Sequence, residues 1–165
     1  MPALAPARHR SVFYRPRRGK EAVTSNYDEA LQEVLDTREK SEYWRSSRLF
    51  EEAHRQLQEL ADLGPNWDSY GAEVPSESAK STAEKIIALL RSMSVPPTRI
   101  VASSEGGIGI CFVHEDRYAD LECFNTGEIV AVSYRGTQEP HAWEVAPKDE
   151  SIKAAIEQIR AHFSA

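Results

Sequence analysis

The spacing of apolar residues divides the chain into a helical first half and a strand-forming second half. Apolar residues recur three and four positions apart over 31–35 and again over 50–61, which is the period of an amphipathic helix. The pattern predicts one long helix over 28–62, or two helices that break near residues 46–47. Gly64-Pro65 ends this region, because glycine suits the left-handed position after a helix and proline cannot continue one.

The rest of the chain gives one more helix, a run of strands and a last helix. A helix is predicted over 76–94 with Ser76 as its N-cap, and a final helix over 149–163. Between them, apolar residues alternate with a period of two, which predicts about five strands over 99–146. This order predicts an α+β domain: an antiparallel meander of four to five strands with two to three helices packed on one face.

A hairpin register follows from the apolar alternation of two predicted strands. If Val113 pairs with Tyr118, then six apolar residues lie on one side of the sheet: Ile108, Ile110, Phe112, Ala119, Leu121 and Cys123. Cys111 then points to the face opposite Cys123, and we expect no disulfide between them. For the next strand the pattern leaves two alternatives, in which either Ile129 and Ala131 or Val130, Val132 and Tyr134 face the core.

Charge is distributed unevenly along the 165 residues, which hold 26 acidic and 20 basic side chains for a net charge of −6. The first 20 residues contain no acid and six basic residues: Arg8, Arg10, Arg15, Arg17, Arg18 and Lys20. The other 145 residues therefore carry −12. We interpret residues 1–26 as a disordered basic arm before a single domain over 27–165. The arm either binds nucleic acid, with Phe13 or Tyr14 stacking on a base, or is a solvated tail that can fold back on the acidic body.

Composition excludes several classes of protein and site. No run approaches 18 apolar residues and no apolar region follows the basic start, so we expect neither a membrane span nor a secretory signal. Two cysteines indicate a reduced, cytoplasmic chain. His114-Glu115-Asp116 is a candidate metal site, but three adjacent turn residues rarely converge on one ion. Without a nucleotide-binding glycine motif either, no metal or cofactor is expected.

A short aromatic motif lies between the first two predicted helices. Residues 67–72 read Trp-Asp-Ser-Tyr-Gly-Ala and are followed by Pro75-Ser76, with Glu-Gly-Gly-Ile at 105–108. This combination resembles a family of small uncharacterised bacterial and phage proteins with a W-D-[GS]-Y-G-A…P-[ST] motif and a downstream [DE]-G-G-I strand. The resemblance covers about residues 60–134. It implies an accessory protein of mobile or defence-rich bacterial regions, such as phage defence, and the family has no established activity.

The motif has a structural and a catalytic interpretation. In the structural one, Asp68 accepts backbone hydrogen bonds, Gly71 permits a sharp bend, and the rings of Trp67 and Tyr70 fix the connection between helices. In the catalytic one, Asp68 serves as acid, base or ligand in a hydrolase or transferase, with His114 or Cys111 as further candidates. One carboxylate without a positioned partner is a poor catalyst, so we predict that the chain is not an enzyme.

The sequence therefore favours a protein-interaction module of a bacterial multi-protein, defence or regulatory system. The partner surface would be the sheet face that no helix covers. Its apolar residues would be Cys111, Val113, Tyr118, Phe124 and, in one alternative, Ile129, and the acidic residues Asp120 and Glu122 would lie among them. The partner would be another protein or a second copy joined through the long helix. The alternative function is auxiliary nucleic-acid binding by the basic arm.

Overall fold

The computed structural model describes residues 21–164, with side chains described from residue 32 onward. Residues 1–41 and 42–165 form two separate units, and each is described by itself. Most of the predicted basic arm lies outside the described residues, so its disorder is not tested. Residues 21–26, which the sequence assigned to that arm, form the first turns of a helix.

Three helices form in the described part of the chain: two lie close to the predicted bounds, and the first begins seven residues before its predicted start. Helix α1 (Glu21–Glu59) is unbroken at residues 46–47, so the one-helix alternative is correct, and a 3-10 turn, η1 (Leu60–Asp62), follows it. Helix α2 (Glu77–Ser92) begins after Ser76, whose hydroxyl accepts a hydrogen bond from the Ala79 backbone N–H at 3.1 Å, as predicted for an N-cap. Helix α3 (Asp149–Ser164) closes the fold.

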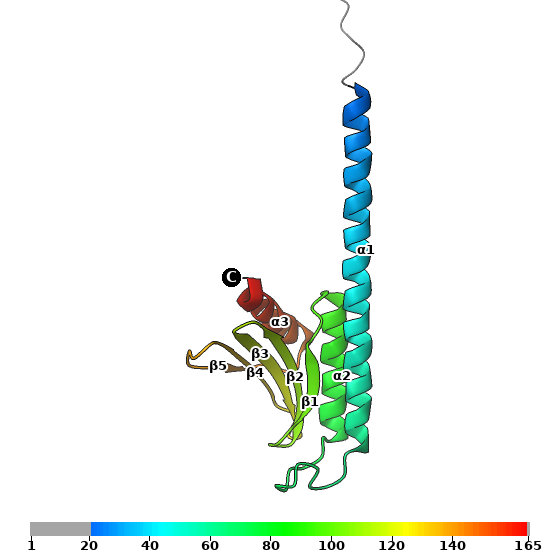
Figure 1. Cartoon of the computed structure of the whole chain (residues 1–165). Helices are drawn as coiled ribbons and strands as arrows, with labels where there is room; N and C mark the ends of the chain where they lie inside the picture. Colours follow the sequence, from blue (N-terminus) through cyan, green and yellow to red (C-terminus); the bar gives the residue numbers. More distant parts are fainter. Residues whose placement is uncertain (1–20, 165) are drawn as a thin grey trace, which may run out of the picture. The chain divides into compact units, whose positions relative to one another are not determined.

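Five strands form one sheet in chain order, β1-β2-β3-β4-β5, with every neighbouring pair antiparallel. The strands are β1 (Arg99–Ser103), β2 (Gly107–His114), β3 (Arg117–Phe124), β4 (Ile129–Arg135) and β5 (His141–Glu144). Figure 1 shows this meander beside the helices. The predicted α+β class and the antiparallel meander are both confirmed.

The predicted register of the β2–β3 hairpin is correct. Val113 pairs with Tyr118, and Cys111 and Cys123 lie on opposite faces of the sheet. On β4, Ile129 pairs with Cys123 and is buried, and Ala131 joins it on the core face. The placement of Ile129 on the partner face is therefore wrong, because the pairing puts it on the side that the helices cover.

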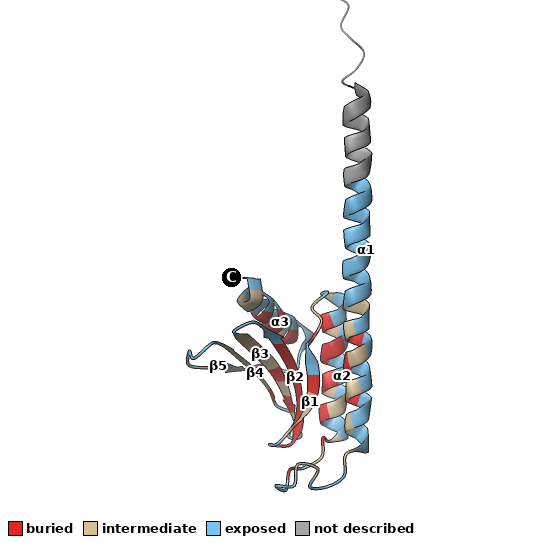
Figure 2. Cartoon of the chain, viewed as in Figure 1, coloured by how far each residue is buried: buried red, intermediate tan, exposed pale blue. Residues whose placement is uncertain are grey.

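The hydrophobic core lies on one side of the sheet. Its sheet layer includes Ile110 and Leu121, and both helices α2 and α3 bury aliphatic side chains against this layer (Figure 2). Phe50, Ala53 and Leu57 of α1 belong to the same core. This end of α1 therefore packs on the protein's own fold.

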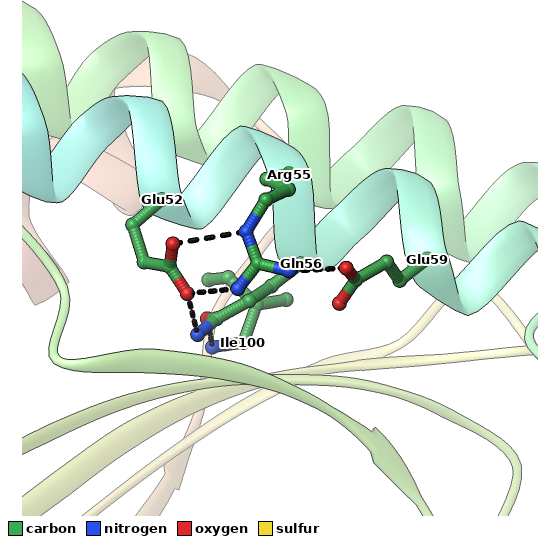
Figure 3. Close-up of polar contacts among 5 residues, drawn as sticks. All are labelled: Glu52, Arg55, Gln56, Glu59 and Ile100. Atoms are coloured by element: carbon green, nitrogen blue, oxygen red, sulfur yellow. Dashed lines mark hydrogen bonds and ion pairs between the residues drawn. The ribbon is translucent and has the colours of Figure 1, made fainter.

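Helix α1 also satisfies a backbone group at the edge of the sheet. The Gln56 side-chain carbonyl accepts a hydrogen bond at 2.8 Å from the backbone N–H of Ile100, which lies in the edge strand β1 (Figure 3). The other end of the Gln56 amide donates to Glu52 at 2.8 Å, and Arg55 joins Glu52 to Glu59. An edge strand with a satisfied N–H is less open to pairing with another chain.

We expect Gln56→Ala to destabilise the fold by about 1–2 kcal/mol, since it leaves the part-buried Ile100 N–H without its acceptor. Chemical denaturation would measure the change. The control is Gln58→Ala, an exposed residue on the same helix, which should have little effect. Equal effects of the two variants would show that the contact contributes nothing specific.

Candidate functional site

The Trp67–Ala72 motif forms a tight loop held by its own polar side chains. One carboxylate oxygen of Asp68, Oδ1, accepts hydrogen bonds from the backbone N–H groups of Tyr70 at 2.9 Å and Ala72 at 3.0 Å. Asn66 Oδ1 accepts the Gly71 N–H at 2.7 Å, and Trp67 Nε1 donates to the Glu73 carbonyl at 3.3 Å. The backbone hydrogen bonds from Tyr70 and Ala72 lower the pKa of Asp68 below its usual value.

The two rings of the motif have different environments. Trp67 is half-buried with its indole N–H bonded, whereas the Tyr70 side chain is 94% exposed. Gly71 follows with φ +93°, a conformation that favours glycine. Trp67 and Asp68 make hydrogen bonds to nearby backbone groups and Gly71 makes a bend, which is compatible with the structural interpretation. Tyr70 does not help to fix the connection, because its ring projects away from the fold.

A single side chain joins this loop to the sheet. Asn125, in the turn between β3 and β4, donates from Nδ2 to the Val74 carbonyl at 3.0 Å and accepts the Ser76 N–H at 2.7 Å through Oδ1. Its own backbone N–H donates to the Gly106 carbonyl at 3.0 Å. The start of α2 and two strand turns are therefore held at one point.

We expect Asp68→Ala to lower the melting temperature, because two backbone N–H groups lose their acceptor. The pKa of Asp68 is lowered in the fold, so its carboxylate stabilises the protein above the unfolded pKa, and this contribution is lost as pH falls through the folded pKa. Melting curves from neutral to acidic pH should converge for wild type and variant at the acidic end. A constant difference at every pH would contradict this assignment.

The candidate catalytic groups do not come together. Asp68 lies in the loop that Asn125 joins to the Gly107 end of β2, whereas His114 is the last residue of that strand. The two ends of β2 are seven residue steps apart, a rise of about 23 Å. Cys111 lies between them and is buried. A surface hollow of about 490 Å³ beside the motif is lined by Pro65, Asn66, Gly71, Ala72, Glu73 and Val74, without the Asp68 side chain.

The opposite side of the sheet is the strongest candidate for a binding surface. We call it the open face, because the core and its helices lie on the other side. The pairing places on it Val101, Cys111, Val113, Tyr118, Asp120, Glu122, Phe124, Val130, Val132 and Tyr134, together with Arg99 and Glu144. Val113 is 44% exposed, and most of the other apolar members are half-buried. The two tyrosine rings stack at 4.9 Å.

Of the predicted partner residues, Cys111, Val113, Tyr118 and Phe124 are on this face and Ile129 is not, and one of the four is inaccessible. Val113, Tyr118 and Phe124 are at least partly exposed, whereas Cys111 is only 2% exposed and can offer little contact area. Val130, Val132 and Tyr134 are additional members. The sequence could not assign them, because either alternation of β4 gave a plausible apolar face.

The side chains of Tyr118, Asp120 and Cys111 form a polar cluster on the open face. The Tyr118 hydroxyl donates to Asp120 Oδ2 at 2.8 Å and lies 3.6 Å from Cys111 Sγ. Asp120 Oδ1 is buried without a hydrogen-bond partner. Burial raises the pKa of Asp120, of Glu122 and of the Cys111 thiol, so the structure gives no reason to expect a reactive thiolate.

We expect Asp120→Asn to change how stability depends on pH. Because the pKa of Asp120 is raised in the fold, its contribution is most favourable below the unfolded pKa and is lost as pH rises through the folded pKa. The free energy of unfolding of the variant should therefore increase relative to that of the wild type as the pH rises from acidic to neutral. Urea titrations at several pH values measure this difference, with exposed Glu51→Gln as control. A difference that is independent of pH would contradict the expectation.

Helix α1 also exposes large apolar side chains. Val34 and Leu35 are 64% and 44% exposed, and Tyr43 and Trp44 are 68% and 64% exposed with their rings in edge-to-face contact at 5.6 Å.

Other kinds of site have little support in the described part of the chain. Among these residues, no three or more His, Cys, Asp or Glu side chains are grouped so that they could bind a metal ion. None of the described helices has an apolar stretch that could cross a membrane. No protein-family model matches the chain, and neither a curated protein nor a solved structure does.

Proposed function

We propose that this chain is a non-enzymatic protein-interaction module that binds its partner through the open face. The observation that carries the proposal is the one-sided core: the described helices bury one face of the sheet and leave a second face with aliphatic and aromatic side chains. A surface of this kind, with Val113 44% exposed, is typical of a protein-binding site.

The charges of the open face indicate the kind of partner. Asp120, Glu122 and Glu144 lie on it, and the basic residue that the strands place there is Arg99. Opposite charge across an interface promotes association and excludes partners of like charge. The proposed partner is therefore a protein with basic and apolar side chains.

Two further observations support a binding role over an enzymatic one. The Asp68 carboxylate is engaged by the backbone of its own loop, and the other candidate groups lie elsewhere on the sheet. The resemblance of the motif and of Glu105–Ile108 to the bacterial and phage family supports an accessory role in a cytoplasmic multi-protein system, such as a defence or regulatory assembly.

The experiment compares three full-length proteins in pull-downs from the native host, followed by affinity measurement with the purified partner. Val132→Arg places a cation in the middle of the open face, and Gln158→Arg places one on the exposed side of α3. Wild type and Gln158→Arg should bind the partner with similar affinity, and Val132→Arg should lose at least tenfold. A partner that binds all three equally would refute the assignment of the face. Light scattering after size exclusion would reveal a second copy as the partner.

Auxiliary nucleic-acid binding by residues 1–20 is the second candidate function. The observation that favours it is the six basic residues without an acid in this segment. Binding should weaken with salt at a slope of about −0.7 to −0.9 per phosphate neutralised, and Arg15→Ser/Arg17→Ser/Arg18→Ser should reduce that slope. An unchanged slope in the triple variant would exclude the segment.

A further inference from the structure

The two edges of the sheet differ in how their backbone groups are satisfied. At the edge formed by β1, the side chain of Gln56 accepts the hydrogen bond of the Ile100 N–H. The other edge is β5, and Figure 1 shows it on the side of the meander away from α2. All residues of β5 except the half-buried Trp143 are exposed. In the described part of the chain, none of them forms a backbone hydrogen bond outside its pairing with β4. An edge strand in this state can pair with a strand of another chain.

The ladder between β4 and β5 determines which backbone groups of β5 point outward. The Val145 N–H donates to the Ile129 carbonyl at 2.8 Å. Backbone groups alternate in direction along an antiparallel strand, so Trp143 also turns its N–H and C=O toward β4. The N–H and C=O groups of Ala142 and Glu144 therefore point away from the sheet, where a further strand can bond to them.

These outward groups are complementary to themselves. Consider two copies of β5 paired antiparallel, with Trp143 of one copy opposite Trp143 of the other. Ala142 then lies opposite Glu144 of the second copy and exchanges both hydrogen bonds with it, and Glu144 does the same with Ala142 of the second copy. This register therefore satisfies every outward N–H and C=O group of the two residues.

The residues that flank β5 fit the same register. Pro140 lies opposite Ala146 of the second copy. Pro140 has no N–H to donate, and the Ala146 carbonyl that would have accepted it is already engaged by the Lys148 N–H at 2.7 Å. The missing donor and the occupied acceptor thus coincide, and no group is left unsatisfied by their meeting.

The two neighbouring symmetric registers fit less well. One places Glu144 opposite Glu144 of the second copy, which brings like charges together. The other places Glu144 opposite Pro140, which cannot donate to the Glu144 carbonyl. In the register centred on Trp143, by contrast, the two half-buried indole rings meet on the core side, each stacked on its own His141 at 5.0 Å.

We propose that β5 is a self-association edge, at which a second copy of this chain adds its own β5 in the register centred on Trp143. The twofold axis is perpendicular to the sheet, because the pairing joins core-facing residues to core-facing residues. The two cores then lie on one side of the joined sheet and the two open faces on the other. The inference goes beyond the proposed function and does not depend on it, since it uses the edge of the sheet.

Sedimentation velocity of the full-length protein over about 1 to 500 µM measures the pairing, because a four-residue strand buries too little area for a permanent dimer. We expect the mass to rise from monomer to dimer within this range. Hydrogen exchange then locates the contact. The amides of Ala142 and Glu144 should exchange about fivefold more slowly at the highest concentration, and the amide of Thr126, in an exposed turn, should not change.

Charge variants at the exposed Ala142 test the register. Ala142→Glu places a like charge opposite Glu144 of the second copy and should weaken the dimer about fivefold, whereas Ala142→Lys places the opposite charge there and should strengthen it by a similar factor. Ala142→Glu/Glu144→Lys restores opposite charges and should return the affinity close to that of the wild type. The control is Ala154→Glu, which adds the same charge on the exposed side of α3 and should change nothing.

Ala142→Pro removes an outward N–H without removing a bond to β4, so the folded variant should stay monomeric over the same range. If this variant does not fold, the charge variants still decide. A wild type that remains monomeric throughout, or a dimer that Ala142→Glu and Ala142→Lys affect equally, would overturn the proposal. So would a dimer in which the amides of Ala142 and Glu144 keep their exchange rates, because such a dimer would form through another surface, such as the open face.

Discussion

Gly107→Ala is expected to destabilise the protein by about 3 kcal/mol or more and to abolish folding if the wild type has little stability to lose. Gly107 opens β2 with φ +150°, and a Cβ atom there would lie 2.2 Å from the Cys123 carbonyl oxygen and 2.9 Å from the Phe124 Cα. Both are backbone atoms of the neighbouring strand, so relief requires the β2–β3 pairing to open. That pairing positions both the core and the open face.

Two other glycines serve to separate the two causes of the expected destabilisation, which are steric overlap and backbone conformation. Gly127 has φ +92° with nothing within 4 Å of its Cβ position, and Gly64 has neither a close neighbour nor a positive φ. Gly127→Ala should therefore cost about 1–2 kcal/mol from backbone conformation alone, and Gly64→Ala almost nothing. Urea denaturation of the three variants tests the series. A Gly107→Ala protein as stable as Gly127→Ala would show that the strand pairing yields easily.

Asn125→Ala is expected to destabilise the protein by about 2–4 kcal/mol, because the Val74 carbonyl and the Ser76 N–H both lose their partner. Both groups are part-buried at the start of α2, where water replaces a lost hydrogen bond poorly. The variant should also release the Trp67–Ala72 loop from the sheet. Faster hydrogen exchange at the Ser76 amide would report this release directly.

Two neighbouring changes serve as controls for Asn125. Asn125→Asp keeps an acceptor for the Ser76 N–H but loses the donor to Val74, so its effect should be intermediate. Thr126→Ala removes only an exposed hydrogen bond to Glu128 and should change stability little. If all three variants were equally stable, the loop would be held by its internal hydrogen bonds alone.

The sequence determined most of the secondary structure and one strand register. A period of two with apolar residues on one side defines the β2–β3 pairing, because a slip of one residue would turn the whole apolar set away from the core. The amphipathic pattern likewise gave α2 and α3 nearly to the residue. Among the α1 residues whose side chains are described, 32–59, burial begins at Phe50. The earlier part of the helix has little apolar periodicity, so its start at Glu21 was not anticipated.

Tertiary structure decided the features that have no local signal. Ile129 and Ala131 face the core because β4 pairs with β3 in one register, although both alternations of β4 are apolar. Cys111 is buried on the open face, which its alternating position did not reveal. Gln56 and Asn125 satisfy backbone groups 44 and 49 residues away. Such contacts depend on where distant segments meet, and residue spacing along the chain does not encode that meeting point.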